Sequence, residues 1–468
     1  MFDLLYRPLT EIVDLLARRE LSPVELMETT LDRIDATHEK LNAFVALCDR
    51  DALLLDASAS EERIARGEGR PLEGIPLGVK DLEDVEGLVT SEGSVPFRDN
   101  LATQDSVQVA RLRAAGAIVV GKTNAPEFGY TALTKNLLFG VTRNPWNLEQ
   151  TPGGSSGGSS AAIAGGVIPL VTASDGGGSV RIPASFTGCF GLKPSYGRIP
   201  HESIDLWTMN DTSVHGPLTR TVEDATLHMD VVVGPHPLDP NSLPHPGISY
   251  RDALGNLPSG LRIGFSPDLG YAVIQSDIAE IACDAARAFE EMGHHFEEVK
   301  QGLPELGRDW GMVSAFELLG RIGHLLPERE GDFGRAFIRG VNAGREMTPE
   351  LWADVRRRRA ELNRWCANVF GRYDLLLTPT VSFDAPPAKG PFPNETEGRT
   401  QPMASVGSFT IPFNLSWHPA ATVRAGLSKA GMPAGLQIVA ARHRDELVLQ
   451  AAFAFERARP WSGEWPRP

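Results

Sequence analysis

Cysteine is scarce in this chain of 468 residues, and no two of its four cysteines form a CxxC pair. The absence of that spacing argues against a cysteine-based zinc site, and four scattered thiols do not indicate a disulfide framework. We therefore expect reduced cysteines, as in a cytoplasmic protein. They are Cys48, Cys189, Cys283 and Cys366.

Long apolar runs and excess basic charge are also missing. No window approaches the roughly 20 apolar residues that a membrane-spanning helix needs. The first residues, MFDLLYRPLTE, have an acid at position 3 and no basic segment before the short apolar run, unlike a secretory signal. The formal net charge is −15, whereas nucleic acids and anionic membranes attract basic patches. We expect neither as a partner.

One dense basic run remains, from Arg356 to Arg359. Asp354 and Glu361 flank it, and alternating charge of this kind favours salt bridges along an exposed helix face. We interpret the run as a solvated helix face. It lies in a mostly helical, irregular region at about 303–370 that could cap a pocket.

Strand signals recur along the rest of the chain. The alternating apolar residues of IPLGVK predict a strand that carries Lys80 at or near its end. Residues 261–299 predict a strand, a helix and a second strand, the order of a βαβ unit. Residues 374–381 and 434–443 have the composition of buried strands.

Helix starts can be placed from capping residues. Ser22 and Pro23 have the pattern of an N-cap and a first helical residue, and Thr10 is a candidate cap for a shorter helix before them. Asp105 is a candidate cap for a third helix, which would end at Gly116 before a strand.

The most unusual composition lies in residues 151–183, TPGGSSGGSSAAIAGGVIPLVTASDGGGSVRIP. Two glycine–serine clusters flank a small apolar run there. Glycine-rich turns beside hydroxyls let backbone N–H groups converge on one point, which suits an anion or a developing oxyanion. A flexible linker is also rich in glycine and serine, but it would not enclose AAIAGGVIPLVTA.

Two familiar motifs match this sequence by accident. Residues 116–123 fit the phosphate-binding loop, yet the residues between its glycines form an apolar, strand-forming run. Residues 153–157 fit GxSxG, the nucleophile elbow of α/β-hydrolases, but no strong strand leads into Ser155. That interpretation needs a downstream histidine, and none has a local signature. The candidates are His201, His215 and His418.

Several separated motifs follow one another in a specific order. They are GIPLGVKD at 74–81, GKTNAPEFG at 121–129, FGVTRNPWN at 139–147, the glycine–serine stretch, GLKPSYGR at 191–198, and the C-terminal FNLSWHPA and GMPAGLQIV. In these motifs and their order the chain resembles the amidase signature family over nearly its whole length. Motifs in series are far more specific than any one of them.

The resemblance implies roles for individual residues. In that family a lysine, a serine in a cis peptide bond and a nucleophilic serine form the triad, which falls here on Lys80, Ser155 and Ser179. Backbone N–H groups of Gly176, Gly177, Gly178 and Ser179 would hold the oxyanion. Ser156, Asp175 and Arg181 would brace the site. Gly176 stands where many relatives have Thr or Ile, which should loosen the loop without removing a donor.

The chemistry of these residue types agrees with those roles. A serine hydroxyl needs a base at neutral pH, and the glycine–serine stretch contains no histidine. A lysine can serve if burial brings its pKa down from about 10.4. Ser155 would relay the proton while Ser179 attacks the carbonyl carbon. Departure of the amine would leave an acyl-enzyme, which water would hydrolyse.

The resemblance also implies a fold and a substrate class. It implies one α/β domain over residues 1–468, with a mixed twisted β-sheet covered by α-helices. It implies hydrolysis of a small-molecule carboxylic amide without cofactor or metal, by a monomer or homodimer. Anilides, esters and carbamates are further candidate substrates. Candidate substrate contacts are Tyr130, Phe128 and Gly154, and the aromatic residues Trp207, Trp417 and Phe316 could also line an apolar pocket.

Two alternatives come from other functional classes. The glutamine-hydrolysing component of the tRNA-dependent amidotransferase typically has KTNMDEFAMGSS where this chain has KTNAPEFGYTAL. A need for ATP and a partner protein would favour that alternative. A non-catalytic binding protein on the same fold is the other, and the intact residues Lys80, Ser155 and Ser179 argue against it.

A metal-independent mechanism can be tested directly. The sequence contains no HExxH motif or comparable His/Asp cluster, so we expect amide hydrolysis to be unchanged by EDTA. The measurement is the initial rate after prolonged incubation with the chelator, beside an untreated sample. Inactivation that added metal reverses would contradict a serine mechanism.

Overall fold

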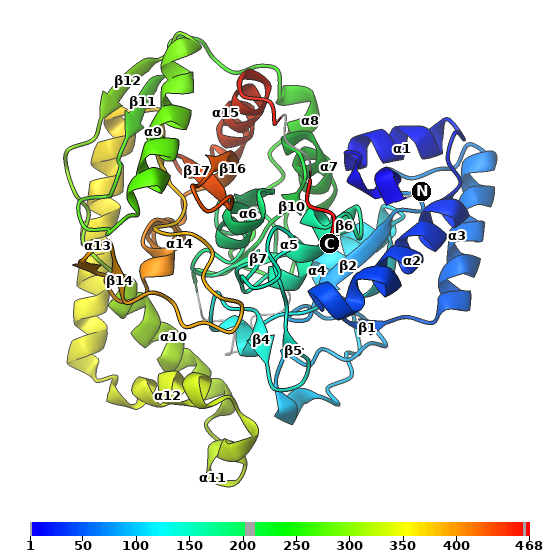
Figure 1. Cartoon of the computed structure of the whole chain (residues 1–468), viewed down its shortest axis with the longest axis horizontal. Coiled ribbons are helices and arrows are strands. Elements are labelled where there is room, and N and C mark those ends of the chain that lie inside the picture. The colour runs from blue at the N-terminus through cyan, green and yellow to red at the C-terminus, as the bar shows by residue number, and fades with distance from the viewer. Residues whose placement is uncertain (1, 202–210, 462–464) are drawn as a thin grey trace.

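Two β-sheets form the centre of the molecule in the computed structural model, which describes residues 2–201, 211–461 and 465–468 (Figure 1). The smaller sheet has the strand order β1-β3-β2-β6, and the larger has β10-β8-β16-β17-β13-β11-β12. Strands β6 and β10 lie in contact, so the two sheets adjoin there. Their strands are β1 Phe44–Leu47, β2 Pro76–Lys80, β3 Ile118–Thr123, β6 Leu170–Val171, β8 Phe190–Lys193, β10 Leu218–Thr219, β11 Arg262–Phe265, β12 His295–Glu298, β13 Leu375–Pro379, β16 Ala420–Leu427 and β17 Pro433–Ala440.

Both sheets are mixed. Strand β2 pairs in parallel with β3 and β6, while β1 runs antiparallel to β3. In the larger sheet β11 is parallel to β12 and β13, whereas β13, β17, β16, β8 and β10 pair antiparallel in succession. The parallel pair β11 and β12, joined through a helix, confirms the predicted βαβ unit. The α/β class with a mixed sheet is confirmed too.

Helices cover the larger sheet on both faces, as expected. Along β13, Leu375 and Leu377 belong to the apolar cluster that includes residues of α9 and α15, whereas Leu376 belongs to the cluster that includes residues of α13. This alternation follows from the two-residue period of a strand. The helices are α1 Leu9–Ala17, α2 Pro23–Leu41, α3 Arg50–Ala65, α4 Val107–Ala114, α5 Gly157–Ala164, α6 Arg181–Thr187, α7 Val222–Val232, α8 Tyr250–Ala253, α9 Ser276–Glu291, α10 Gly307–Ile322, α11 Leu326–Arg329, α12 Arg335–Ala343, α13 Pro349–Arg372, α14 Ile411–Leu415 and α15 Asp445–Ala458.

The helix starts agree only in part with the capping signals. Ser22 caps α2, and its side chain accepts a hydrogen bond from the N–H of Val24. Thr10 instead lies inside α1, where its backbone N–H donates to Asp224. The cap of α4 is Ser106 rather than Asp105. The tertiary contact with Asp224 accounts for the position of Thr10, and the hydroxyl of the neighbouring Ser106 accounts for the cap of α4. The local capping pattern does not reveal either contact.

The region at 303–370 is mostly helical, as expected, and includes α10, α11, α12 and α13. In Figure 1, α10 and α12 lie together below the larger sheet, and α13 packs against β13 of that sheet. Figure 1 also places α1, α2 and α3 beside the smaller sheet.

Two further expectations concern cysteines and membrane spans. The four cysteines are free thiols, as predicted. Among the described residues, no helix has the length and apolar character required to cross a membrane.

Candidate active site

The glycine–serine stretch is tightly packed against the end of the smaller sheet. Its first cluster opens α5, whose residues are all buried. A side-chain carbon on Gly158 would lie 2.3 Å from the backbone nitrogen of Asn124, which follows β3. Only glycine permits this approach of helix and strand. The close packing puts Ser155 and Ser156, at the start of α5, beside the end of β2.

Lys80 ends β2, as the sequence pattern predicted, and its side chain is fully buried. Its Nζ lies 2.9 Å from Oγ of Ser155, 2.8 Å from Oγ of Ser156 and 2.9 Å from Oγ of Ser174. An ammonium group can only donate hydrogen bonds, whereas a neutral amine also accepts one. Because a hydroxyl can donate as well as accept, this environment accommodates both forms of the lysine.

The buried position of Lys80 changes its acidity. Burial lowers the pKa of Lys80 to about 7, and the nearby charges of Glu83 and Asp175 oppose this shift without cancelling it. Near neutral pH a large fraction of Lys80 is therefore an uncharged amine. Such an amine can accept a proton from a serine hydroxyl.

Ser155 follows a cis peptide bond with Gly154, as the family resemblance implied. Its hydroxyl accepts a hydrogen bond from Lys80, whereas the candidate histidines have other neighbours. His201 Nε2 lies 3.0 Å from the carbonyl oxygen of Ser213, and His418 Nδ1 lies 2.9 Å from Oγ of Ser416. The remaining candidate is His215, whose Nδ1 is 3.6 Å from Oε1 of Glu83. A serine–histidine pair is thus not the arrangement at Ser155.

The second cluster forms a loop between β7 (Ser174–Asp175) and α6. Side chains from distant parts of the chain hold its carbonyl groups. Trp310 Nε1 and Thr212 Oγ1 donate to the carbonyl oxygen of Gly176, at 2.9 and 3.0 Å. The C=O and N–H of a trans peptide point in opposite directions. The N–H of Gly177 therefore points away from Trp310 and Thr212.

One oxyanion assignment needs correction. The N–H of Gly178 donates to Oδ1 of Asp175 at 2.7 Å, so it already has an acceptor. The loop N–H groups that have no hydrogen-bond partner within the described residues include those of Gly177 and Ser179. At Gly176 an added side-chain carbon would have its nearest neighbour 3.9 Å away, so this position has room for a Cβ.

Asp175 and Arg181 form a buried ion pair beneath the loop. Arg181 Nε and Nη2 donate to the two oxygens of Asp175 at 3.0 and 2.9 Å, and Asn414 adds a donor at 2.8 Å. Burial by itself would raise the pKa of Asp175, but the charge and hydrogen bonds of Arg181 and the Asn414 amide hold it well below its usual range. Both side chains are fully buried, so the pair braces the loop from inside.

Two cavities meet at Ser179. One, of about 660 Å³, has a largely apolar wall; the other, of about 670 Å³, is polar and also contacts Ser155. We call them the apolar cavity and the polar cavity. The side chains that give the apolar cavity its character include Ile182, Met312, Ala315, Phe392, Val406 and Ile411.

Some of the predicted substrate contacts line the two cavities, and others do not. Tyr130 lines both cavities, Gly154 lines the apolar one and Phe128 the polar one. Phe316 lines neither: it is 45% exposed and lies near Trp352. Trp417 is outside both as well, and Trp207 lies outside the described residues.

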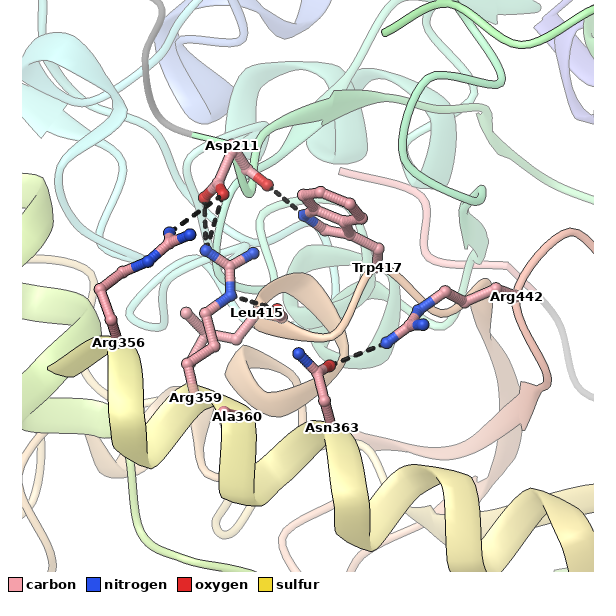
Figure 2. Close-up of a pocket in the computed structure, with 8 residues that line it drawn as sticks. All are labelled: Asp211, Arg356, Arg359, Ala360, Asn363, Leu415, Trp417 and Arg442. Atoms are coloured by element: carbon pink, nitrogen blue, oxygen red, sulfur yellow. Dashed lines mark hydrogen bonds and ion pairs between the residues drawn. The ribbon is translucent and has the colours of Figure 1, made fainter.

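Trp417 lines a separate outer pocket of about 260 Å³, drawn in Figure 2. Arg359 also lines it, and the interpretation of the arginine run as a solvated face is wrong for this residue. Its side chain is only 12% exposed, because it pairs with Asp211 at 2.7 Å and donates to the carbonyl of Leu415. Arg357 is exposed and pairs with Asp354, as expected.

Several residues that hold the site were not identified from sequence. Asn414 lies in FNLSWHPA and Gln437 in GMPAGLQIV, so both belong to motifs that had been recognised. Gln437 accepts a hydrogen bond from Arg181 at 2.7 Å. Thr410 Oγ1 donates to the carbonyl of Gly177 at 2.7 Å, and neither Thr410 nor Trp310 had a local signal.

Comparison with known proteins gives consistent matches along the chain. A family model described as Amidase matches residues 25–449. An acylamidase from Rhodococcus erythropolis is 38% identical over 477 residues, covering 98% of this chain and 96% of that protein. A glutamyl-tRNA(Gln) amidotransferase component from Geotalea daltonii is 34% identical over 480 residues, covering 96% and 97%.

A solved structure agrees equally well. The crystal structure of a bacterial aryl acylamidase, described as an amidase signature enzyme, superposes with a TM-score of 0.92 at 32% identity. The match covers 98% of this chain and 97% of that one. The likeness therefore extends over the whole fold and both sheets.

The buried ion pair predicts a large loss of stability on substitution. Asp175→Asn removes the charge that compensates Arg181, and breaking a buried pair in this way costs about 3–5 kcal/mol. The free energy of unfolding from urea titration measures the loss. Asp354→Asn, at the exposed pair with Arg357, is the control, with an expected change below about 1 kcal/mol. Equal losses in the two variants would contradict a bracing role for Asp175.

Proposed function

The chain belongs to the amidase signature family, and we propose that it hydrolyses carboxylic amides through an acyl-enzyme formed on Ser179. Hydrolysis of amide bonds as such follows from the family. The observation that carries the finer proposal is the fully buried Lys80, whose amine lies 2.9 Å from the hydroxyl of Ser155. Ser155 and Ser179 line the same cavity, so a proton relay can run from nucleophile to lysine.

The reaction begins with proton transfer. Neutral Lys80 accepts the proton of Ser155 as Ser155 accepts that of Ser179, and Oγ of Ser179 bonds to the substrate carbonyl carbon. No hydrogen bond joins the two serine hydroxyls within the described residues, and the proposed relay requires one to form when substrate is bound. Catalytic hydrogen bonds are often long in the absence of substrate.

Backbone donors stabilise the resulting oxyanion. The N–H groups of Gly177 and Ser179 are free to bind it, and that of Gly176 is the third proposed donor. Trp310 and Thr410 fix the loop by holding its carbonyls. A side-chain carbon on Gly177 would lie 2.5 Å from the Trp310 ring, so the loop and the ring are in close contact. Donors fixed in advance need no reorganisation during the reaction.

The C–N bond then breaks as the departing nitrogen takes a proton from Ser155, which recovers one from Lys80. A water molecule then gives a proton through Ser155 to Lys80 as its oxygen bonds to the acyl carbon. The C–O bond to Ser179 breaks, and Ser179 regains its proton from Lys80 through Ser155 as the acid is released. Ser156 and Ser174 stay hydrogen-bonded to the Lys80 amine and keep it aimed at Ser155. Bond making and proton transfer thus balance over the cycle without a cofactor or metal.

We infer N-acylated amines as the substrate class. The relatives named acylamidase and aryl acylamidase support it, and the two cavities beside Ser179 offer room for two halves of such a molecule. Anilides fit the same description, and esters and carbamates share the carbonyl chemistry. We propose that the protein acts on its own, as a monomer or homodimer.

A second candidate is the glutaminase component of an amidotransferase. The 34% identity with the Geotalea daltonii protein favours it, while KTNAPEFGYTAL at residues 122–133 departs from the typical sequence of that component. Ammonia release from glutamine, with and without ATP and partner proteins, separates the two candidates. An independent amidase would leave glutamine largely intact under both conditions.

The lowered pKa of Lys80 predicts the pH dependence. Its protonated form cannot act as the base, so kcat/KM should fall about tenfold per pH unit below pH 7 and level off above it. The measurement is a pH series on a neutral amide, whose own protonation does not change. An optimum near pH 6 that declines toward alkaline pH would exclude a lysine base.

Removal of either end of the relay should abolish turnover. Ser179→Ala and Lys80→Met should each lower kcat/KM at least about 10³-fold, because the nucleophile or its base is lost. Release of coloured amine from a nitroanilide panel measures this. Ser58→Ala, on the exposed face of α3, is the matched serine control and should retain wild-type activity. Normal turnover in Ser179→Ala would refute the acyl-enzyme on that residue.

A further inference from the structure

Helix α10 lines both cavities at Ser179. Its residues Trp310, Ser314, Glu317, Leu318 and Arg321 line the polar cavity. They recur at intervals of three or four, so they occupy one face of the helix. Trp310 also lines the apolar cavity, together with Gly307, Gly311, Met312 and Ala315. Adjoining sides of one helix therefore contact the two chambers, and Trp310 contacts both.

The proton relay indicates which half of the substrate enters which chamber. This step rests on the proposed function. Ser155 must give its proton to the departing nitrogen, and Ser155 lines the polar cavity but not the apolar one. The amine half should consequently lie in the polar cavity, while the acyl half extends into the apolar cavity.

The polar cavity has an excess of negative charge. Five of its described lining residues are acidic and one is an arginine: Asp84, Glu92, Asp211, Asp239, Glu317 and Arg321. Three of the acids have partners on the protein. Glu92 accepts from Arg321 at 2.8 Å, Asp211 pairs with Arg359, and Asp239 accepts from backbone N–H groups.

Glu317 differs from those three acids. Within the described residues its carboxyl group makes no hydrogen bond, and Oε2 is buried without a partner. Burial first, and then the charge of Asp211, raise the pKa of Glu317 to about 7, while Arg359 opposes the shift. A partly buried carboxylate without a hydrogen-bond partner is unfavourable, and a bound cation would relieve that cost.

We propose that Glu317 is a specificity-determining residue that binds an ammonium group on the amine half of the substrate. The preferred substrates are then N-acylated diamines, in which one nitrogen is acylated and the other is a free, protonated amine. The acyl group lies against the apolar wall, and the free ammonium pairs with Glu317 across the cavity from Ser155. The leaving diamine departs through the polar cavity.

A matched pair of amides tests this assignment. Both carry the same acyl group, with 1,4-diaminobutane as the amine in one and pentylamine in the other, so the pair differs in charge at similar length. At about pH 8 the free amine is charged and Glu317 is mostly ionised. The readout is the ratio of kcat/KM for the diamine amide to that for the pentyl amide.

The expected ratio in the wild type is about 10 or more, since a partly desolvated ion pair contributes roughly tenfold. Glu317→Gln keeps the shape and should lower the ratio about tenfold, and Glu317→Asp, which keeps the charge, should restore part of it. Asp84→Asn removes a charge from the same cavity wall and is the control for general electrostatic attraction. Its ratio should change less than about threefold.

The outcomes separate this inference from the proposed function. An unchanged ratio in Glu317→Gln, or equal effects of Glu317→Gln and Asp84→Asn, would overturn the assignment to Glu317 while amide hydrolysis stands. Preference for the pentyl amide in the wild type would do the same. Failure of the wild type to hydrolyse any amide of a broad acyl panel would overturn the proposed function, and this inference with it.

Discussion

The burial of one amine is the constraint on which the rest of the site depends. Lys80 has no contact with solvent, so its nitrogen must find hydrogen-bonding partners inside the protein. Three serine hydroxyls supply them: Ser155 and Ser156 from the first glycine–serine cluster, and Ser174 from β7 just before the second. The clusters can reach the lysine because small residues let α5 approach β3 closely. Burial also lowers the pKa of Lys80 to about 7, against the nearby charges of Glu83 and Asp175.

A second set of interactions fixes the loop that carries Ser179. Asp175 and Arg181 neutralise one another under the loop, and Thr410 and Trp310 hold its carbonyls from two other helical regions. The hydrogen bonds from Thr410 and Trp310 each occupy a backbone carbonyl group of the loop. Among the described residues, the N–H groups of Gly177 and Ser179 keep no hydrogen-bond partner, as the proposed binding of an oxyanion requires.

The sequence was a good guide to local structure and to residues inside recognised motifs. It was a poor guide to contacts between residues that lie far apart in the chain. The strand that ends at Lys80 followed from alternation, and the motif series gave the family. The N–H of Gly178 was misassigned because Asp175 takes it through a tertiary turn. Trp310 was missed because it lies 134 positions from Gly176, and Arg359 was misjudged because Asp211 is 148 positions away. Such pairings depend on the folded topology.

The contact of α10 with both chambers has a consequence for how such an enzyme diversifies. Substitutions at Met312 or Ala315 alter one chamber, while substitutions at Ser314 or Glu317 alter the other, although these residues are neighbours along a single helix. Selection, or a mutagenesis library confined to one short segment, can therefore adjust each chamber nearly independently. The strand and glycine loop that carry Lys80 and Ser179 need not change at all.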